Sequence, residues 1–232
     1  DGPDGRPAVY EVAYTFGWKP LQQYLVRFPG GRLQAFSVAW DTERRRWFFL
    51  YPGKTIPPSD WLHWTGNGQN WNTMCSHCHS TNLQKNYIEA NDSYHTTYNE
   101  VSVGCESCHG PASVHAALMQ SGDYEKNKNN AGNKSGFQFK LDSASQITRC
   151  AECHTRKTDI NPKLASLEFG DNMIIQNLSN EFYHADGQID DEDFELGSFM
   201  QSKMFKHGVV CSNCHQPHSG KLKASGNNLC LQ

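Results

Sequence analysis

The sequence contains one five-residue pattern, C-x-x-C-H, four times, and this repeat restricts the structure of the chain more than any other feature. The copies occupy residues 75–79, 105–109, 150–154 and 211–215. They account for eight of the nine cysteines. A fold that fits this chain has to place four cysteine pairs, each followed at once by a histidine.

The pattern is the attachment signature of c-type haem. Two thiols separated by two residues reach the two vinyl groups on one edge of a porphyrin, and the next histidine lies under the iron as its proximal ligand. We therefore expect four covalently bound haems. The predicted thioether cysteines are Cys75, Cys78, Cys105, Cys108, Cys150, Cys153, Cys211 and Cys214, and the predicted proximal ligands are His79, His109, His154 and His215.

Two other uses of paired cysteines are open. Zinc knuckles also use C-x-x-C pairs, but they do not require a histidine directly after each second cysteine. A disulfide framework would explain neither the four histidines nor an odd number of cysteines. Haem attachment explains every position of the repeat, so we favour it over both.

The composition agrees with a core that is completed by a cofactor. Hydrophobic residues make up 37% of the 232 residues, and the mean hydropathy is -0.69, yet aromatic residues reach 12%. Disordered chains lack aromatic residues, so the low apolar content does not indicate disorder. Four macrocycles would supply the missing apolar surface. In a chain of this length they must share walls, and we expect neighbouring haems to stack.

The ninth cysteine, Cys230, has no partner within the repeat. Cys230-Leu231-Gln232 matches the first three positions of a further C-x-x-C-H. We expect Cys230 to bind a fifth haem in a longer protein, so that the haem domain is incomplete at this end. A free terminal thiol or a disulfide between chains is the alternative.

The first 60 residues contain no haem motif and have the pattern of a small antiparallel sheet. Residues 9–16, 21–28, 32–40 and 46–51 are rich in β-branched and aromatic side chains. Residues 29–31 and 41–45 separate them like hairpin turns. We divide the chain into a β-rich segment, 1–60, and a multihaem domain, 61–232.

The multihaem domain is expected to be mostly irregular, with short helices around stacked haems. Residues 110–122 have a proline near the first turn and a glycine past the end, which is typical of a helix. Residues 197–208 repeat Phe199, Met200, Lys203 and Met204 at helical spacing, and we expect the two methionines to lie in the core. Residues 121–136 have the composition of a polar surface loop.

Seven further histidines could supply the second axial ligand of each iron. The two ligands of one iron have Cα atoms on opposite faces of the ring, so His218 follows His215 too closely to reach the same iron. His115 follows His109 by less than two helical turns and should also serve another haem. The favoured distal ligands are His115, His184, His218 and His63; His95, His207 and His77 are less favoured.

Several stretches resemble a family of bacterial multihaem c-type cytochromes related to cytochrome c-554. They include LHWTGNGQNWNTMCSHCHSTNLQKNY, VGCESCHGPASVH, CAECHTRK and GSFMQSKMFKHGVVCSNCHQPHSG. In that family the segment after GNNLC continues as another haem motif, often followed by tetratricopeptide repeats. The histidines that match His115 and His218 are distal ligands there. The resemblance implies covalent haem attachment outside the cytoplasmic membrane, hence a periplasmic or extracellular location.

Two functions are compatible with these features. A chain of bis-His haems would pass electrons between redox partner proteins or further copies of itself. An extracellular filament is one assembly that such copies could form. The alternative is an oxidoreductase acting on a small nitrogen or sulfur compound, which requires an open axial position. No variant motif marks such a position, so we favour electron transfer without catalysis. The net charge of -3 excludes a basic surface for nucleic acid, and no apolar run is long enough to cross a membrane.

Overall fold

The computed structural model describes the whole chain except residues 125–134, 138–141, 161–168, 177, 191–194 and 232. The fold has two compact units. Unit 1 contains Asp1–Ser107, and unit 2 contains Cys108–Asn161 and Ser166–Gln232. Their boundary therefore falls inside the second C-x-x-C-H motif. The division at residue 60, which separates sequence without haem motifs from sequence that carries them, stays a prediction.

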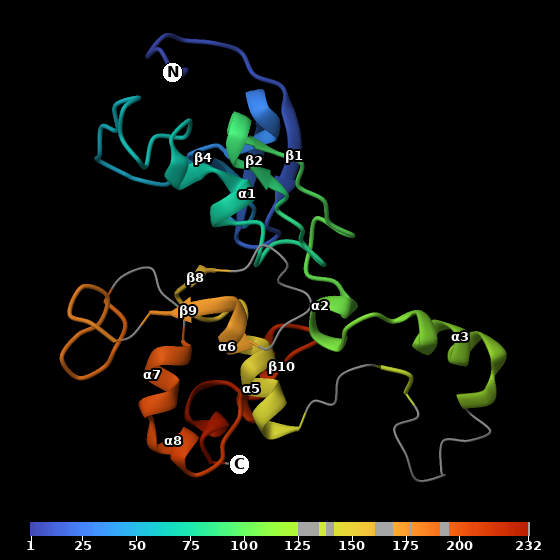
Figure 1. The fold of residues 1–232 in the computed structure, drawn as a ribbon. Coiled ribbons are helices and arrows are strands. Elements are labelled where there is room, and N and C mark those ends of the chain that lie inside the picture. The colour runs from blue at the N-terminus through green and yellow to red at the C-terminus, as the bar shows by residue number, and fades with distance from the viewer. Residues whose placement is uncertain (125–134, 138–141, 161–168, 177, 191–194, 232) are drawn as a thin grey trace. The chain divides into compact units, whose positions relative to one another are not determined.

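Unit 1 is built on a five-stranded antiparallel sheet (Figure 1). The sheet has the order β1-β2-β4-β5, with β3 paired to β2. Eight-residue β2 is long enough to pair with β3 along one half and with β4 along the other. The expected N-terminal antiparallel segment is thus confirmed. Its strands are β1 (Val12–Phe16), β2 (Leu21–Phe28), β3 (Arg32–Ala35), β4 (Val38–Asp41) and β5 (Arg46–Phe49).

The core of unit 1 lies between this sheet and the first haem motif. Leu25, Leu33 and Ala35 of the sheet pack against Trp71 of helix α1 (Trp71–Met74), and all four are buried. Burial of such side chains contributes about 1.5–3 kcal/mol each. The sheet therefore has a protein core of its own, and this core holds the start of the first motif.

Two short elements complete unit 1. The strands β6 (Tyr87–Ile88) and β7 (Ser93–Tyr94) form a hairpin around the 3-10 turn η3 (Glu89–Asn91). Two further 3-10 turns, η1 (Pro29–Gly31) and η2 (Asn67–Gln69), connect larger elements. Gly31 has φ +73, and a Cβ there would meet the backbone oxygen of Tyr94 at 2.0 Å, so only glycine fits where η1 meets the hairpin.

Unit 2 is mainly short helices with small two-stranded sheets, as expected for the multihaem part. Helix α2 (Cys105–His109) crosses the boundary between the units. The further helices are α3 (Ser113–Ser121), α5 (Ser143–Ala151), α6 (Phe169–Asn172), α7 (Leu196–Gln201), α8 (Lys203–Lys206) and α9 (Cys211–Cys214). The strand pairs are β8 (Lys157–Asp159) with β9 (Met173–Ile175) and β10 (His215–Gln216) with β11 (Lys221–Leu222), and the 3-10 turn η5 (Gly226–Leu229) precedes Cys230.

The predicted helices of unit 2 are formed with one difference. α3 lies within residues 110–122 and ends at Gly122, which has φ +70. The second predicted helix is broken at Ser202, whose extended backbone ends α7 and whose hydroxyl caps α8 by accepting from the Phe205 amide at 3.1 Å. Met200 and Met204 are exposed, so the expectation that they lie in the core was wrong. Residues 125–134 of the predicted polar loop lie outside the described residues.

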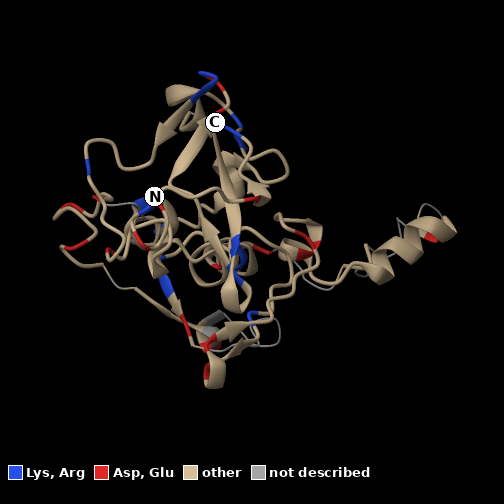
Figure 2. Ribbon diagram, turned by 90° about the horizontal axis from the view of Figure 1, so that it is seen from above, with Lys and Arg blue, Asp and Glu red and all other residues tan. Residues whose placement is uncertain are grey.

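Segments coloured for Lys and Arg and segments coloured for Asp and Glu both occur in the ribbon (Figure 2). Arg44, Arg45 and Arg46 form a short basic run. The presence of both signs agrees with the small net charge. None of the described helices combines the length and the apolar character that crossing a membrane requires.

Candidate haem-binding sites

The first motif follows directly from the buried core of unit 1. Asn70 caps α1 by accepting from the Asn72 amide at 3.0 Å, and the amide of Cys75 continues the turn to the Trp71 carbonyl at 3.2 Å. The His79 amide then donates to the Cys75 carbonyl at 3.1 Å. One helical turn therefore brings the first cysteine and the histidine of this motif to the same side of the chain.

The histidine of the first motif lies against the sheet. The ring of Phe16 meets the His79 ring edge-on, with 5.4 Å between ring centroids. The imidazole stays open to solvent on one side, but the surrounding atoms desolvate it and lower its pKa. A lowered pKa favours the neutral imidazole, which is the form that binds a metal.

A buried threonine positions the second motif next to the first. The hydroxyl of Thr81 accepts from the Gly104 amide at 2.8 Å, donates to the Ser102 carbonyl at 2.7 Å and contacts the Ser107 hydroxyl at 2.8 Å. Thr81 follows the first motif in sequence, and Ser107 lies inside α2. The chain entering α2 is thus fixed by a residue that adjoins the first haem motif.

The rings of His109, Phe137 and His115 form a stack at the second motif. The Phe137 ring lies 4.6 Å from the ring of His109 and 4.0 Å from that of His115, centroid to centroid. The Nδ1 atom of His115 lies 2.5 Å from the Ser135 carbonyl oxygen. As donor in this contact, Nδ1 carries the proton and leaves Nε2 available to iron.

His218 is a second ring neighbour of His109. The two ring centroids are 6.2 Å apart, and the ring planes are 18° from parallel. Desolvation lowers the pKa of His109, and the neighbouring His218 and His115 lower it further. Two predicted distal ligands thus converge on the proximal ligand of the second motif. The sequence excluded pairings of His218 with His215 and of His115 with His109, and it gave no indication that His218 lies near His109.

The third and fourth motifs meet at their first cysteines. The Cys150 thiol, near the end of α5, interacts with the Cys211 thiol at the start of α9. This interaction raises the pKa of Cys150 and lowers that of Cys211 to about 6. The Ser212 amide donates to Gln146 Oε1 at 2.8 Å and ties the same two helices together.

The histidines of these two motifs have different surroundings. The Nδ1 atom of His154 lies 3.2 Å from Oε2 of Glu195, and the His154 carbonyl accepts from the Leu196 amide at 3.1 Å. His215 begins β10, is exposed, and pairs with Leu222 of β11. The fourth motif therefore leaves the helical turn before its histidine.

The remaining favoured ligands lie apart from one another in the sequence. His63 is buried, its Nδ1 lies 2.8 Å from the Thr65 hydroxyl, and burial lowers its pKa. His184 is exposed and its Nε2 lies 3.1 Å from Oδ1 of Asp190, a contact that must break before Nε2 can reach an iron. Within the described ranges, Nε2 of His63 has no contact of this kind, whereas Nε2 of His184 does.

The less favoured positions are all near the surface. His95 and His207 are exposed, and His77 is half-buried inside the first motif. Cys230 is exposed and follows η5. Reasoning from sequence missed Ser135, Phe137 and Glu195, because each acts through a partner at least 20 positions away.

The residues of the motifs fit covalently bound haem. The nine cysteines are not joined in disulfides, so the disulfide framework is not formed. Among the described residues no group of three or more His, Cys, Asp or Glu side chains is placed to hold a metal ion, as a zinc knuckle would require. The buried Nε1 of Trp71 has no hydrogen-bond partner in the described part of the chain, and a polar group of a bound cofactor could supply one.

The core of unit 2 fits the same group. The buried apolar cluster found among the described residues belongs to unit 1. In unit 2 the buried apolar side chains are scattered along the chain, for example Ala151, Met173 and Val210. Unit 2 nevertheless carries most of the motif residues, so macrocycles would supply apolar surface where the chain itself has little.

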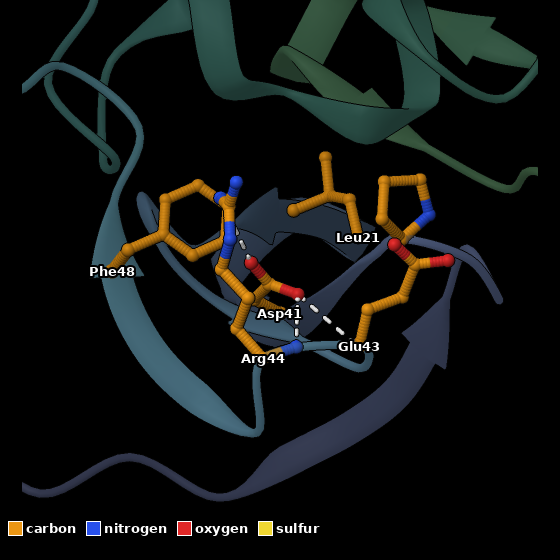
Figure 3. Close-up of a pocket in the computed structure, with 6 residues that line it drawn as sticks. Leu21, Asp41, Glu43, Arg44 and Phe48 are labelled. Atoms are coloured by element: carbon orange, nitrogen blue, oxygen red, sulfur yellow. Dashed lines mark hydrogen bonds and ion pairs between the residues drawn. The ribbon is translucent and has the colours of Figure 1, made fainter.

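A hollow of about 260 Å³ in unit 1 does not look like a reaction site (Figure 3). Leu21, Glu43 and Phe48 line it, together with Asp41 and Arg44. The carboxylate of Asp41 accepts from the Glu43 amide at 3.0 Å and the Arg44 amide at 2.9 Å, and these bonds lower its pKa. Asp41 therefore stabilises the turn between β4 and β5.

Part of the sequence and the fold are similar to those of known cytochromes. Residues 63–110, which include His63 and the first two motifs, match the family model of cytochrome c554 and c-prime. The fold is similar to that in the crystal structure of the outer cell wall cytochrome OcwA, with a TM-score of 0.51 and 13% identity. The similarity covers 89% of this chain and 44% of that one. No curated protein matches the sequence.

Four C-x-x-C-H motifs on a largely irregular scaffold are the arrangement that attaches haem c covalently. The chain is similar to the cytochromes c554 and c-prime over residues 63–110, and its fold is similar to that of an outer cell wall cytochrome. Electron transfer by a c-type cytochrome is the function that this family and fold support. The chain spans less than half of the solved structure that it matches, so the activity of a whole protein is treated below as a proposal.

Proposed function

We propose that this chain transfers electrons through four covalently bound haems whose irons each have two histidine ligands. At each motif, the two thiols would add across two vinyl groups. Each addition forms one C–S bond and moves the thiol hydrogen to the neighbouring vinyl carbon. The bound iron supplies reversible one-electron chemistry. The chain's own part is to hold the groups close together and to fill both axial positions.

The relation between His109 and His218 carries this proposal. Metal–imidazole bonds are about 2 Å long, and a ring centroid lies roughly 1 Å behind the ligating nitrogen. Two imidazoles on opposite faces of one iron therefore have centroids roughly 6 Å apart. The observed separation is 6.2 Å. We assign His109 and His218 to the same iron, as proximal and distal ligands. The two rings are stacked, so each has to turn until one of its nitrogens points at the metal.

His115 would ligate a different iron from the one bound by His109. Phe137 stacks on the rings of both His109 and His115, so the His109 and His115 rings meet through the phenyl ring. His115 follows His109 by less than two helical turns, which is too short for both to bind one iron. His115 would then ligate another haem through Nε2, since its Nδ1 faces the Ser135 carbonyl. Ligands exchanged between motifs would join the haems of unit 2 into one group.

Close haem spacing is supported by the thiol pair of the third and fourth motifs. Each first cysteine would bear one edge of its own haem. The Cys150 and Cys211 thiols interact, and the Ser212 amide bond to Gln146 holds their two helices together. Haems attached there would have adjacent edges. Electron transfer between them would need no protein group in between.

We extend the proposal to location and assembly. The similar solved structure is an outer cell wall cytochrome, which supports a periplasmic or extracellular place for this chain. Its partners would be redox proteins or further copies of itself. Strand β1 lies at one end of the sheet order, and Val12 on it is half exposed, so a second copy could add a strand there and extend a filament. Sedimentation and electron microscopy over a range of concentrations test the filament.

One experiment tests the haems and their ligands together. Pyridine haemochrome absorbance of purified protein comprising residues 1–232 should give four haems per chain. The ferric spectrum should be low-spin, without a high-spin charge-transfer band, and the reduced protein should bind carbon monoxide slowly if at all. Two haems or fewer would refute the attachment sites. Four haems with rapid carbon monoxide binding would favour the oxidoreductase instead.

A further inference from the structure

The third motif differs from the others in what lies behind its histidine. Among the four proximal histidines, the contacts of the described residues place a carboxylate against His154 alone, with Glu195 Oε2 3.2 Å from Nδ1. The neighbours of His79 and His109 are the rings of Phe16 and Phe137. The third site thus combines its proximal imidazole with a negative charge.

The backbone holds this carboxylate in place. Glu195 immediately precedes α7, and the next residue, Leu196, is buried and donates its amide to the His154 carbonyl at 3.1 Å. The contact between Glu195 and His154 is therefore supported by a backbone hydrogen bond and by the buried side chain of Leu196. Exposed ion pairs usually contribute little, because both side chains stay mobile. Here the bond from the Leu196 amide to the His154 carbonyl keeps the backbones of the two partners adjacent.

The contact also determines which nitrogen of His154 can bind iron. Nδ1 donates its proton to the carboxylate, so Nε2 carries the lone pair. A carboxylate behind a ligating histidine fixes its tautomer and orientation and makes it a stronger electron donor. Negative charge near the metal stabilises the ferric state more than the ferrous state, since the ferric iron has one more positive charge.

We propose that Glu195 is a positioning residue that lowers the reduction potential of the haem attached at Cys150 and Cys153. This inference rests on the proposed function, because it requires a haem bound through His154. It assigns the third haem a role as the most easily oxidised member of its local group. The site also faces Cys211, which interacts electrostatically with both His154 and Glu195. The third haem would thereby give its electron readily to the haem of the fourth motif.

The test uses the holoprotein and three substitutions at one position. Glu195→Gln keeps a hydrogen-bond acceptor and removes the charge, Glu195→Ala removes both, and Glu195→Asp keeps the charge. The readout is a spectroelectrochemical titration that resolves the four haem potentials. We expect one potential to rise in Glu195→Gln and to rise further in Glu195→Ala, with the other three unchanged. Glu195→Asp should restore most of the wild-type value.

The matched control is Glu152→Gln. Glu152 lies between the two cysteines of the same motif, and its carboxylate is 2.6 Å from the Arg149 guanidinium. The Glu152→Gln substitution therefore removes one negative charge from the same motif and leaves the contact at Nδ1 of His154 in place. Its effect on the third haem should be smaller. An equal effect in both variants, unchanged potentials in Glu195→Ala, or loss of one haem in Glu195→Gln would each overturn the proposal. A wild-type protein without four haems would instead refute the proposed function itself.

Discussion

His109 and His218 face each other with 6.2 Å between ring centroids and ring planes 18° from parallel. Two imidazoles that share one iron would have this separation once each ring turns a nitrogen toward the metal. The chain brings the histidine of the second motif and a histidine beyond the fourth motif together. A shared iron there would close a long loop of unit 2 through the haem.

Replacing His218 by alanine should change the spin state of one haem. The iron held by His109 would lose its sixth ligand and become high-spin, while the haem count stays at four. Absorbance and electron paramagnetic resonance would detect the change, and added imidazole should reverse it. His207→Ala removes another exposed histidine of unit 2 and should leave all four haems low-spin. An unchanged spectrum in His218→Ala would contradict the pairing.

Replacing His115 by alanine should affect a different iron, because Phe137 lies between the rings of His115 and His109. The double variant His115→Ala/His218→Ala distinguishes the two cases. It should contain two high-spin haems, measured as twice the high-spin signal of either single variant. A double variant with only one high-spin haem would show that both histidines serve the same iron.

Trp71 should contribute to the stability of unit 1 through packing more than through its ring nitrogen. Trp71→Ala opens a cavity among Leu25, Leu33 and Ala35, and it should lower the free energy of unfolding by about 3–5 kcal/mol. Trp71→Phe should cost less, since Nε1 makes no hydrogen bond within the protein. Denaturant unfolding of the holoprotein measures both. A phenylalanine variant as unstable as the alanine variant would indicate that Nε1 binds a cofactor group.

Asn72 should be the most sensitive polar residue near the first motif. Its buried side chain accepts from the Leu33 amide at 2.8 Å and donates to Thr96 Oγ1 at 2.9 Å. Asn72→Ala leaves the buried Leu33 amide without this acceptor, which costs about 1–3 kcal/mol for that group alone. Urea unfolding should show the loss. The exposed Asn99→Ala is the control and should stay within about 0.5 kcal/mol of wild type.

The N-terminal sheet could be predicted because its signals are local. Alternating β-branched and aromatic residues and the turn at 29–31 indicate strands regardless of what surrounds them. The division of residues 32–40 into β3 and β4 was not predictable in this way. It depends on β2, which is long enough to pair with both. The helix break at Ser202 also escaped prediction, because the apolar spacing of 197–208 continues through it.

The candidate sites also have some features that local sequence patterns predict and others that depend on contacts between distant residues. The cysteines and proximal histidines follow from a five-residue pattern, since attachment to one porphyrin edge requires that spacing. The pairing of His109 with His218 and the contact of Glu195 with His154 join residues far apart in sequence. Chain-length arguments could exclude pairings that are too short, but they could not select among the long ones. Those depend on how the whole of unit 2 packs.

The unequal cores of the two units bear on quality control in the cell. Unit 1 has Leu25, Leu33, Ala35 and Trp71 packed together by the chain alone, whereas the described part of unit 2 has no such cluster. A molecule that never received haem would have a folded N-terminal half joined to a half that opens easily. Proteases cleave segments that open easily. Molecules that escaped haem attachment would therefore be cut C-terminal to the first motif and removed.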